Sequence, residues 1–375
     1  MAFGTHLTDY EHTAGFGTFP GDCCTGEIKY ERKGYLLLGP CTLQSAASQQ
    51  IEAGLRLDPM HSPQKPIAVA APSIPAWVDK QINIGVKPPA SPSLNVRFYG
   101  RHDPSATAPV PLVVHFHAGA FVAGSLDEGG CVPRLLAAAG AVVMSLDYPL
   151  APANPFPQAI ETGYAALAWA FKARHKLAGK DAPVFVAGEK AGGNLAAAVA
   201  LMARDRHGPA LAGQILLSPM LNPCMATESL RSVDAGPVGC IWADGWSRYL
   251  ARVDNAANPY AAPGTALRLG GLPPTLLMTA QDDPLRDEAL AYADRLRVFD
   301  RLVHATTLPG PTGWPATYLE SADVAQEKAD WSASVQQHFS DFFSELANRG
   351  THAGAQGEPA HKPSFFSSHD FVSIP

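Results

Sequence analysis

A lysine occupies the centre of a sharp turn on which many enzymes expose a nucleophile. The stretch VFVAGEKAGGNLAAAVA, residues 184–200, joins a β-branched run, closely spaced glycines and an alanine-rich run. This order predicts a buried strand, a tight turn and a helix, the setting of a G-x-S-x-G nucleophile elbow. The central residue is Lys190, between Gly188 and Gly192. An amine in this place is a candidate base, Schiff-base former or anion-stabilising cation.

Alternating strands and helices must position this turn. From residue 110 onward, short apolar runs alternate with helical patterns. This alternation predicts right-handed βαβ units, so we expect an α/β fold with a mostly parallel central sheet flanked by helices. The expected strands are ASPSLNVRFYG, VPLVVHF, AVVMSLDY, VFVAG, QILLSPM, PTLLMTA and HATTLPG, and the expected helices are RLLAAAG, residues 157–176, the run after the elbow and residues 330–347.

Five motifs in order resemble the hormone-sensitive-lipase family of α/β hydrolases. HFHAGAFVAGS, residues 115–125, resembles the family's HGGGF oxyanion loop with two glycines changed to alanine, and GEKAGGN is similar to its GDSAGGN elbow. The resemblance runs from about Val96 to Asp341. It implies the α/β-hydrolase fold, with a lid over the site. The other similar motifs are DYPLAPANPFPQAIETGYAALAWA (147–170), LLSPML and DDPLRDEALAYADRL (282–296).

Two positions depart from the triad that the resemblance implies. Lys190 replaces the serine, and GPTGWP places Gly313 where the catalytic histidine belongs, so only the carboxylate of Asp283 remains. A Ser-His-Asp hydrolase needs a hydroxyl, a base and a carboxylate that orients the base. We therefore expect no ester hydrolysis through a seryl acyl-enzyme. Ordinary structural or surface roles are expected for two other histidines, His304 and His338.

An anion-stabilising site survives these changes. An oxyanion hole uses backbone N–H groups, which alanine retains where its backbone angles tolerate a side chain. The resemblance implies Gly119, Ala120 and Ala191 as the three donors. Residues expected to support the loop or line the pocket are His117, Phe121, Glu189, Gly313 and Trp314.

Three interpretations of Lys190 remain open. In the first, the protein is inactive, and an ion pair between Lys190 and Asp283 fills its pocket. The reason is that burial either lowers the pKa of an ammonium group or requires a counter-ion for it. In the second, the chain is a repurposed catalyst that cyclises or condenses a carbonyl-bearing natural product. In the third, it is a receptor for a small acid, as the gibberellin receptors of the same family are. Designed inactivation of an esterase fits less well, because two triad positions differ.

The chain divides by composition into a cap, a main domain and a tail. We expect residues 1–70 to form an N-terminal cap and residues 71–349 the α/β-hydrolase domain, with an insertion at about 224–262 that contributes to the cap. Residues 350–375 are rich in small and polar types and are expected to form a flexible tail. The insertion has three aromatic residues at helical spacing, which suit either packing onto the core or substrate stacking: Trp242, Trp246 and Tyr249.

Composition favours a small-molecule partner. The net charge of -6 is not clustered, which argues against nucleic acid, and no apolar run is long enough to span a membrane. No signal-like start is visible, so we expect a cytoplasmic protein. No dinucleotide or P-loop motif and no paired cysteine spacing appears, so we expect neither a cofactor nor a metal. The ligand is expected to be apolar with a carbonyl group, and a homodimer is possible.

Overall fold

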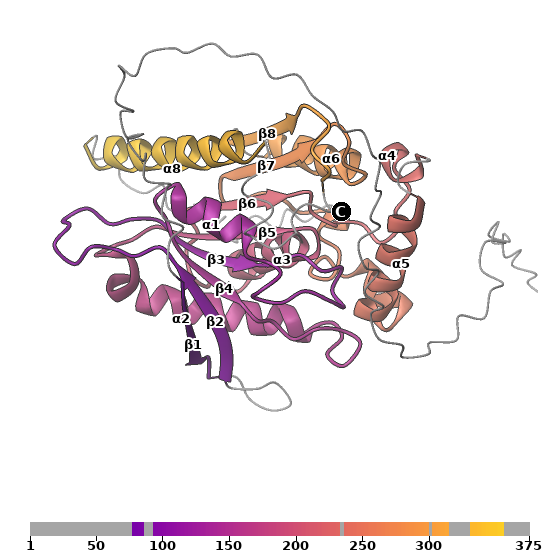
Figure 1. The fold of residues 1–375 in the computed structure, drawn as a ribbon, viewed down its shortest axis with the longest axis horizontal. Helices are drawn as coiled ribbons and strands as arrows, with labels where there is room; N and C mark the ends of the chain where they lie inside the picture. Colours follow the sequence, from indigo (N-terminus) through magenta and orange to yellow (C-terminus); the bar gives the residue numbers. More distant parts are fainter. Residues whose placement is uncertain (1–76, 86–92, 233–235, 300–301, 315–330, 356–375) are drawn as a thin grey trace, which may run out of the picture. The chain divides into compact units, whose positions relative to one another are not determined.

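The computed structural model describes residues 77–85, 93–232, 236–299, 302–314 and 331–355. Within these ranges, the main element is an eight-stranded sheet in the order β1-β2-β4-β3-β5-β6-β7-β8 (Figure 1). The expected cap at residues 1–70 and the tail beyond residue 355 lie outside the described residues.

The sheet is parallel from β4 to β8 and antiparallel at one edge. β1 pairs antiparallel with β2, and β2 pairs antiparallel with β4. The parallel strands β3 to β7 are buried on both faces, which explains their nearly continuous apolar sequences. The strands are β1 (Val78–Asn83), β2 (Ser93–Tyr99), β3 (Leu112–Phe116), β4 (Val142–Leu146), β5 (Val184–Glu189), β6 (Gly213–Leu217), β7 (Thr275–Ala280) and β8 (Val303–Leu308).

Helices cover both faces of the sheet. α2 (Gln158–Ala178), α3 (Ala191–Asp205) and α6 (Arg286–Arg297) contribute to one apolar cluster, whereas α1 (Cys131–Ala138) and α8 (Trp331–Ala355) contribute to the other. α3 is almost wholly buried because its alanines and glycines allow close approach to β5 and to α2. The structure thus confirms the predicted α/β-hydrolase architecture. None of these helices is both long and apolar enough to cross a bilayer.

Two features differ from the sequence-based expectation. β1 was not expected, because its sequence VDKQIN is polar and largely exposed at the sheet edge. α8 continues to Ala355, past the expected end at Ala347 and into the segment expected to be a flexible tail. No proline stands between these two positions, and alanine favours helix.

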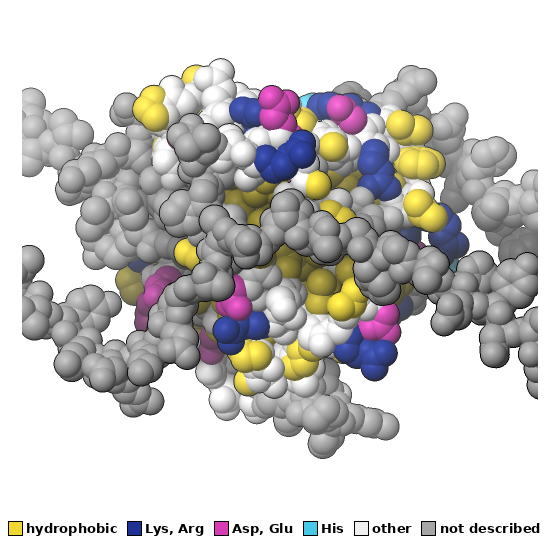
Figure 2. Space-filling view, turned by 90° about the vertical axis from the view of Figure 1, so that its right-hand side faces the viewer, with side chains coloured by type: hydrophobic (Ala, Val, Ile, Leu, Met, Phe, Trp, Pro, Cys, Tyr) yellow, Lys and Arg dark blue, Asp and Glu magenta, His cyan; other side chains and the backbone are white. Residues whose placement is uncertain are grey.

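The insertion after β6 is helical. It contains α4 (Glu228–Arg231), α5 (Gly236–Leu250) and the 3-10 turn η2 (Val253–Ala257). A second 3-10 turn, η3 (Pro263–Thr265), follows the insertion directly. The parallel strands point toward the side of the molecule that carries α4 and α5 (Figure 1). Seen from that side, hydrophobic side chains gather in the middle of the face, with Lys and Arg side chains mostly around them (Figure 2). Ligands of open α/β sheets bind at this edge, beyond the carboxyl ends of the strands.

Candidate functional site

Lys190 lies on a sharp turn between β5 and α3. Its φ of 52° and ψ of -117° place a side chain in backbone space that L residues rarely adopt. Backbone hydrogen bonds hold the turn, and the Lys190 N–H donates to Leu217 O at 3.0 Å. A Cβ at Gly192 would collide with the carbonyl oxygens of Phe116 and His117. Only glycine therefore lets the elbow approach the end of β3 so closely.

The Lys190 side chain is buried and has no partner among the described residues. The residue is 5% exposed, and within the described ranges its side chain makes no hydrogen bond or ion pair. Burial lowers the pKa of Lys190 from 10.5 to about 8, although the charges of Glu189 and Asp283 act in the opposite direction. A substantial fraction of the side chain is therefore a neutral amine near pH 8.

Asp283 is buried near Lys190 but engages other donors. Its Oδ2 accepts a hydrogen bond from Thr279 Oγ1 at 2.6 Å, and its Oδ1 accepts one from the Leu285 N–H at 2.9 Å. Burial raises the pKa of Asp283. These hydrogen bonds, the Ser218 side chain and the Lys190 charge act in the opposite direction and lower it. Among the described residues, Asp283 and Lys190 form no ion pair. The plugging ion pair considered from the sequence is therefore not present.

The loop after β3 carries backbone N–H groups that have no acceptor among the described residues. Gly119 has a φ of 144°, where a Cβ would collide with Ala123 O, and it accepts from the Ala123 N–H at 2.9 Å. Ala120 keeps the left-handed conformation at a φ of 52° despite its methyl group. Within the described part of the chain, no acceptor pairs with the N–H groups of Gly119, Ala120 or Ala191. These three groups are the donors expected for the oxyanion hole.

Glu189 supports this loop from beneath. Its Oε1 accepts the Ala118 N–H at 3.1 Å, and its Oε2 lies 2.8 Å from His115 Nε2. The other ring nitrogen, His115 Nδ1, lies 2.9 Å from Ser145 Oγ. All three side chains are buried, so the network joins β5, β3 and β4 below the loop. Neither His115 nor Ser145 was expected at the site from the sequence, although a polar residue inside an apolar strand is a signal for such a network.

His117 also belongs to the frame of the loop. Its Nδ1 lies 2.8 Å from Ala118 O, and its ring stacks on Tyr148 with the centroids 4.3 Å apart. The Tyr148 hydroxyl donates to His117 O at 2.8 Å. Burial lowers the pKa of His117. A neutral imidazole fixed in this way holds loop geometry rather than serving Lys190.

The segment that should carry a catalytic histidine is held by Asp282. Its Oδ2 accepts the N–H groups of Thr312 and Gly313, both at 2.8 Å. Gly313 is exposed, with a φ of 68°. Trp314 is buried and packs edge-on against Trp331 on α8, 5.3 Å between centroids. Its indole therefore lies in the layer between the sheet and α8, whereas the sequence led us to expect it at the pocket, next to the position of the missing histidine.

α5 packs on the oxyanion loop through aromatic rings. Phe121 stacks on Tyr249 at 4.1 Å and lies 4.8 Å from Trp246. The three aromatic residues at helical spacing in the insertion are all buried, and a Cβ at Gly245 would collide with Ala120 O. Of the two uses considered for these rings, packing onto the core is the one that their contacts support.

Comparison with known proteins agrees with this geometry. Residues 113–312 match a family described as having the alpha/beta hydrolase fold. Esterase LipI of Mycobacterium tuberculosis is 36% identical over 220 residues, which cover 57% of this chain and 68% of LipI. The chain belongs to this family of α/β hydrolases.

Two further similarities show the range of this α/β-hydrolase family. A gibberellin receptor of Oryza sativa is 36% identical over 210 residues, 52% of this chain and 58% of the receptor. The structure of a hyperthermophilic esterase from the archaeon Pyrobaculum calidifontis superposes with a TM-score of 0.59 at 31% identity, covering 73% of this chain and 86% of the esterase. The hormone-sensitive-lipase resemblance is thus confirmed, and relatives include both esterases and receptors.

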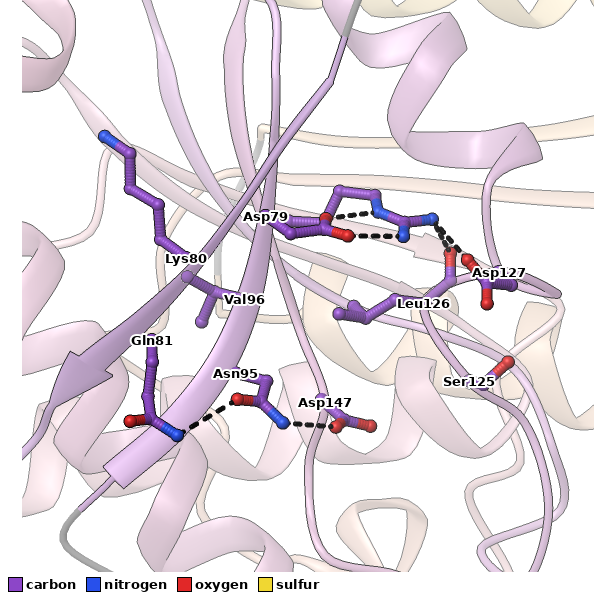
Figure 3. A pocket seen from close by; sticks show the side chains of 10 residues that line it. Asp79, Lys80, Gln81, Asn95, Val96, Ser125, Leu126, Asp127 and Asp147 are labelled. Atoms are coloured by element: carbon purple, nitrogen blue, oxygen red, sulfur yellow. Dashed lines mark hydrogen bonds and ion pairs between the residues drawn. The ribbon is translucent and has the colours of Figure 1, made fainter.

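A separate hollow in this α/β hydrolase lies at the sheet edge. It has a volume of about 400 Å³ and is lined by residues of β1, β2 and the segment that follows the oxyanion loop (Figure 3). Arg97 bridges Asp79, at 2.6 Å from Nε to Oδ1, and Asp127, at 2.8 Å from Nη1 to Oδ1. These pairs tie the edge strand to the segment after the loop, which is a structural role. No group of metal-ligating side chains occurs within the described ranges.

Proposed function

We propose that this α/β hydrolase is a non-hydrolytic catalyst that acts on a small apolar carbonyl compound by cyclisation or carbon–carbon condensation. The observation that carries the proposal is the buried amine of Lys190 on an elbow beside three backbone N–H groups, none of which has a hydrogen-bond partner among the described residues. An amine with a pKa of about 8 works as a base near neutral pH, whereas an ordinary lysine does not.

The proposed chemistry uses the amine and the N–H groups together. The neutral Lys190 amine removes a proton next to the carbonyl, or it forms a Schiff base with the carbonyl carbon and releases water. The N–H groups of Gly119, Ala120 and Ala191 stabilise the negative oxygen of the enolate. Asp283, with its raised pKa, remains a buried carboxyl whose charge favours the ammonium once Lys190 has taken up a proton. The hydrophobic side chains on the face beyond the strand ends suit an apolar substrate (Figure 2).

Seryl ester hydrolysis does not fit the side chains present. Position 190 has no hydroxyl, and Gly313 offers no base. The buried histidines are engaged elsewhere, because His115 pairs with Glu189 and His117 with Ala118 O. The fold alone therefore does not carry the activity of the esterase relatives.

Reductive trapping tests the proposal. The full chain is incubated with benzaldehyde and cyanoborohydride, and its peptides are mapped by mass spectrometry. We expect the benzyl adduct on Lys190, and we expect Lys190→Arg to lose it while the exposed-site control Lys176→Arg keeps it. A second arm follows deuterium exchange next to the carbonyl of cyclohexanone by NMR, which reports base chemistry without a covalent adduct. Failure of both arms overturns the proposal.

A small-acid receptor is a second candidate function. The observation in its favour is the 36% identity to a gibberellin receptor. In that case the Lys190 ammonium would pair with a ligand carboxylate, which would raise the pKa of Lys190 in the complex. Calorimetry with a panel of apolar carboxylic acids tests this. A receptor requires binding that Lys190→Gln weakens and no chemical change in the recovered acid.

A further inference from the structure

We propose that Lys190 is a self-acylation site, where the chain takes an acyl group from an activated ester or thioester and keeps it as an amide. This activity differs from the condensation proposed above and does not depend on it. It uses the same unpaired amine but a different class of reactant, an acyl donor with a good leaving group.

The position of the Lys190 amine suits attack on an acyl carbon. Elbow residues of this fold face a bound acyl carbon, and the backbone of Lys190 has the strained elbow conformation, with a φ of 52°. Its Nζ is not occupied by Asp283, whose oxygens accept from Thr279 and Leu285. The amine is therefore available to attack an acyl carbon delivered to the elbow.

Backbone N–H groups near the elbow are candidate donors for the developing oxyanion. The Glu189 carboxylate accepts the Ala118 N–H. The next two backbone N–H groups, of Gly119 and Ala120, have no acceptor in the described ranges. The Ala191 N–H, at the first residue of α3, is also without one. Donors that are already in place at the transition state stabilise the tetrahedral oxyanion of acyl transfer.

The reaction then stops for lack of a second step. The lone pair of the neutral Lys190 Nζ attacks the acyl carbon, and a nitrogen–carbon bond forms. The bond to the leaving group breaks, the leaving group departs with the electron pair as a phenolate or thiolate, and the nitrogen loses a proton to solvent. An acyl-serine would be hydrolysed with the help of a histidine, but an amide is far less reactive, and position 313 is glycine.

Burial also favours the product. At 5% exposure, the ammonium form of Lys190 is penalised by lost solvation, and an amide removes that charge permanently. The same penalty makes the amine reactive near pH 8, where an ordinary lysine is almost wholly protonated. Lys190 is therefore expected to react at least about tenfold faster than the exposed lysines of the chain.

The test uses p-nitrophenyl acetate on the full chain at pH 8. We expect release of p-nitrophenolate equal to the protein concentration, no continuing turnover, and the mass gain of one acetyl group on the peptide with Lys190. Lys190→Arg and Lys190→Gln should lose the rapid phase, and the exposed-site control Lys176→Arg should keep it. In the unmodified chain, the rate should rise with pH and level off above about 8.

The opposing outcomes are distinct. Three results would each overturn the inference: turnover without a change in protein mass, acetyl labelling spread equally over the exposed lysines, or a reaction rate that keeps rising up to the ordinary lysine pKa. The third result can be obtained with the unmodified chain alone. Acylation without aldehyde trapping or deuterium exchange supports this inference and removes the proposed condensation. Trapping or exchange without acylation does the reverse.

Discussion

The carboxylate of Glu189 accepts the backbone N–H of Ala118 at 3.1 Å, so the residue directly before the elbow lysine holds the start of the oxyanion loop. The other oxygen of the same carboxylate lies 2.8 Å from His115 Nε2. Because Glu189 and Lys190 are adjacent, one short segment positions both the amine and the loop whose N–H groups we propose as oxyanion donors. Elbow and loop are therefore coupled through a single side chain.

Replacing Glu189 should disturb the loop more than the elbow. Glu189→Ala leaves the buried Ala118 N–H and the His115 ring without their partner, which should cost about 2–4 kcal/mol of unfolding free energy. Glu189→Gln keeps an acceptor and should cost less. Denaturant unfolding measures the stability, with the exposed Glu128→Gln as control.

A merely structural role for Glu189 would leave the chemistry of Lys190 intact. In folded Glu189→Gln, we expect a lower acetylation rate at high pH, where the rate no longer depends on pH. We also expect the rate to level off at a lower pH, because the Glu189 charge stabilises the ammonium form of Lys190. An unchanged rate and pH profile in a destabilised variant would show that Glu189 serves stability alone.

Lys190 should destabilise the folded chain below pH 8. A pKa lowered by burial from 10.5 to about 8 means that the unfolded chain binds more protons in this window, so the stability contributed by this group rises from pH 8 to 10.5. Lys190→Met should therefore stabilise the chain by about 3 kcal/mol at pH 7, with the gain shrinking as the pH approaches 10.5.

Paired melting curves from pH 6 to 10.5 measure this effect. Lys176→Met is the matched control, because Lys176 is exposed on α2 and should change the melting temperature little at any pH. Equal melting temperatures of Lys190→Met and the natural chain at pH 7 would mean that the ammonium is well solvated, against the burial described here.

Glu288 should show the opposite pH dependence. This carboxyl is buried on α6, its Oε1 accepts the Leu221 N–H at 3.0 Å, and burial raises its pKa to about 8. The folded chain therefore binds more protons than the unfolded chain between pH 4.5 and 8, and stability contributed by Glu288 is lost as the pH rises through this window.

Glu288→Gln should keep the hydrogen bond from Leu221 without the titration. We expect it to match the natural chain near pH 4.5 and to exceed its stability by several kcal/mol above pH 8. Urea unfolding at pH 5, 7 and 9 measures the difference. A gain that is the same at all three pH values would contradict titration of Glu288 as its cause.

The sequence predicted the parts of this molecule that depend on local pattern. The elbow follows from the glycines around Lys190, and the parallel strands follow from their apolar runs. The contact of Trp314 with Trp331 and the pairing of Glu189 with His115 could not be predicted, because they join residues that only the folded chain brings together. The edge strand β1 was missed for a different reason: one exposed face and polar residues give it no clear period.

Two substitutions should restore ester hydrolysis if residue 313 stands where the family has its histidine. Lys190→Ser supplies the hydroxyl, and Gly313→His supplies a base on the loop anchored by Asp282. Histidine is among the residues that tolerate a left-handed conformation such as the φ of 68° at position 313, at a cost of about 1–3 kcal/mol.

The double variant should hydrolyse p-nitrophenyl acetate with turnover, at least about 100-fold faster than Lys190→Ser alone, because a general base contributes about that much or more. Lys190→Ser with Gly313→Asn is the matched control, since asparagine tolerates the same backbone but is no base. Adding Asp283→Asn should lower the restored rate, because the carboxylate orients the imidazole. If histidine at position 313 is no better than asparagine in a folded protein, the loop does not reach the elbow. The position of that loop, as well as the two missing side chains, would then separate this chain from a Ser-His-Asp hydrolase.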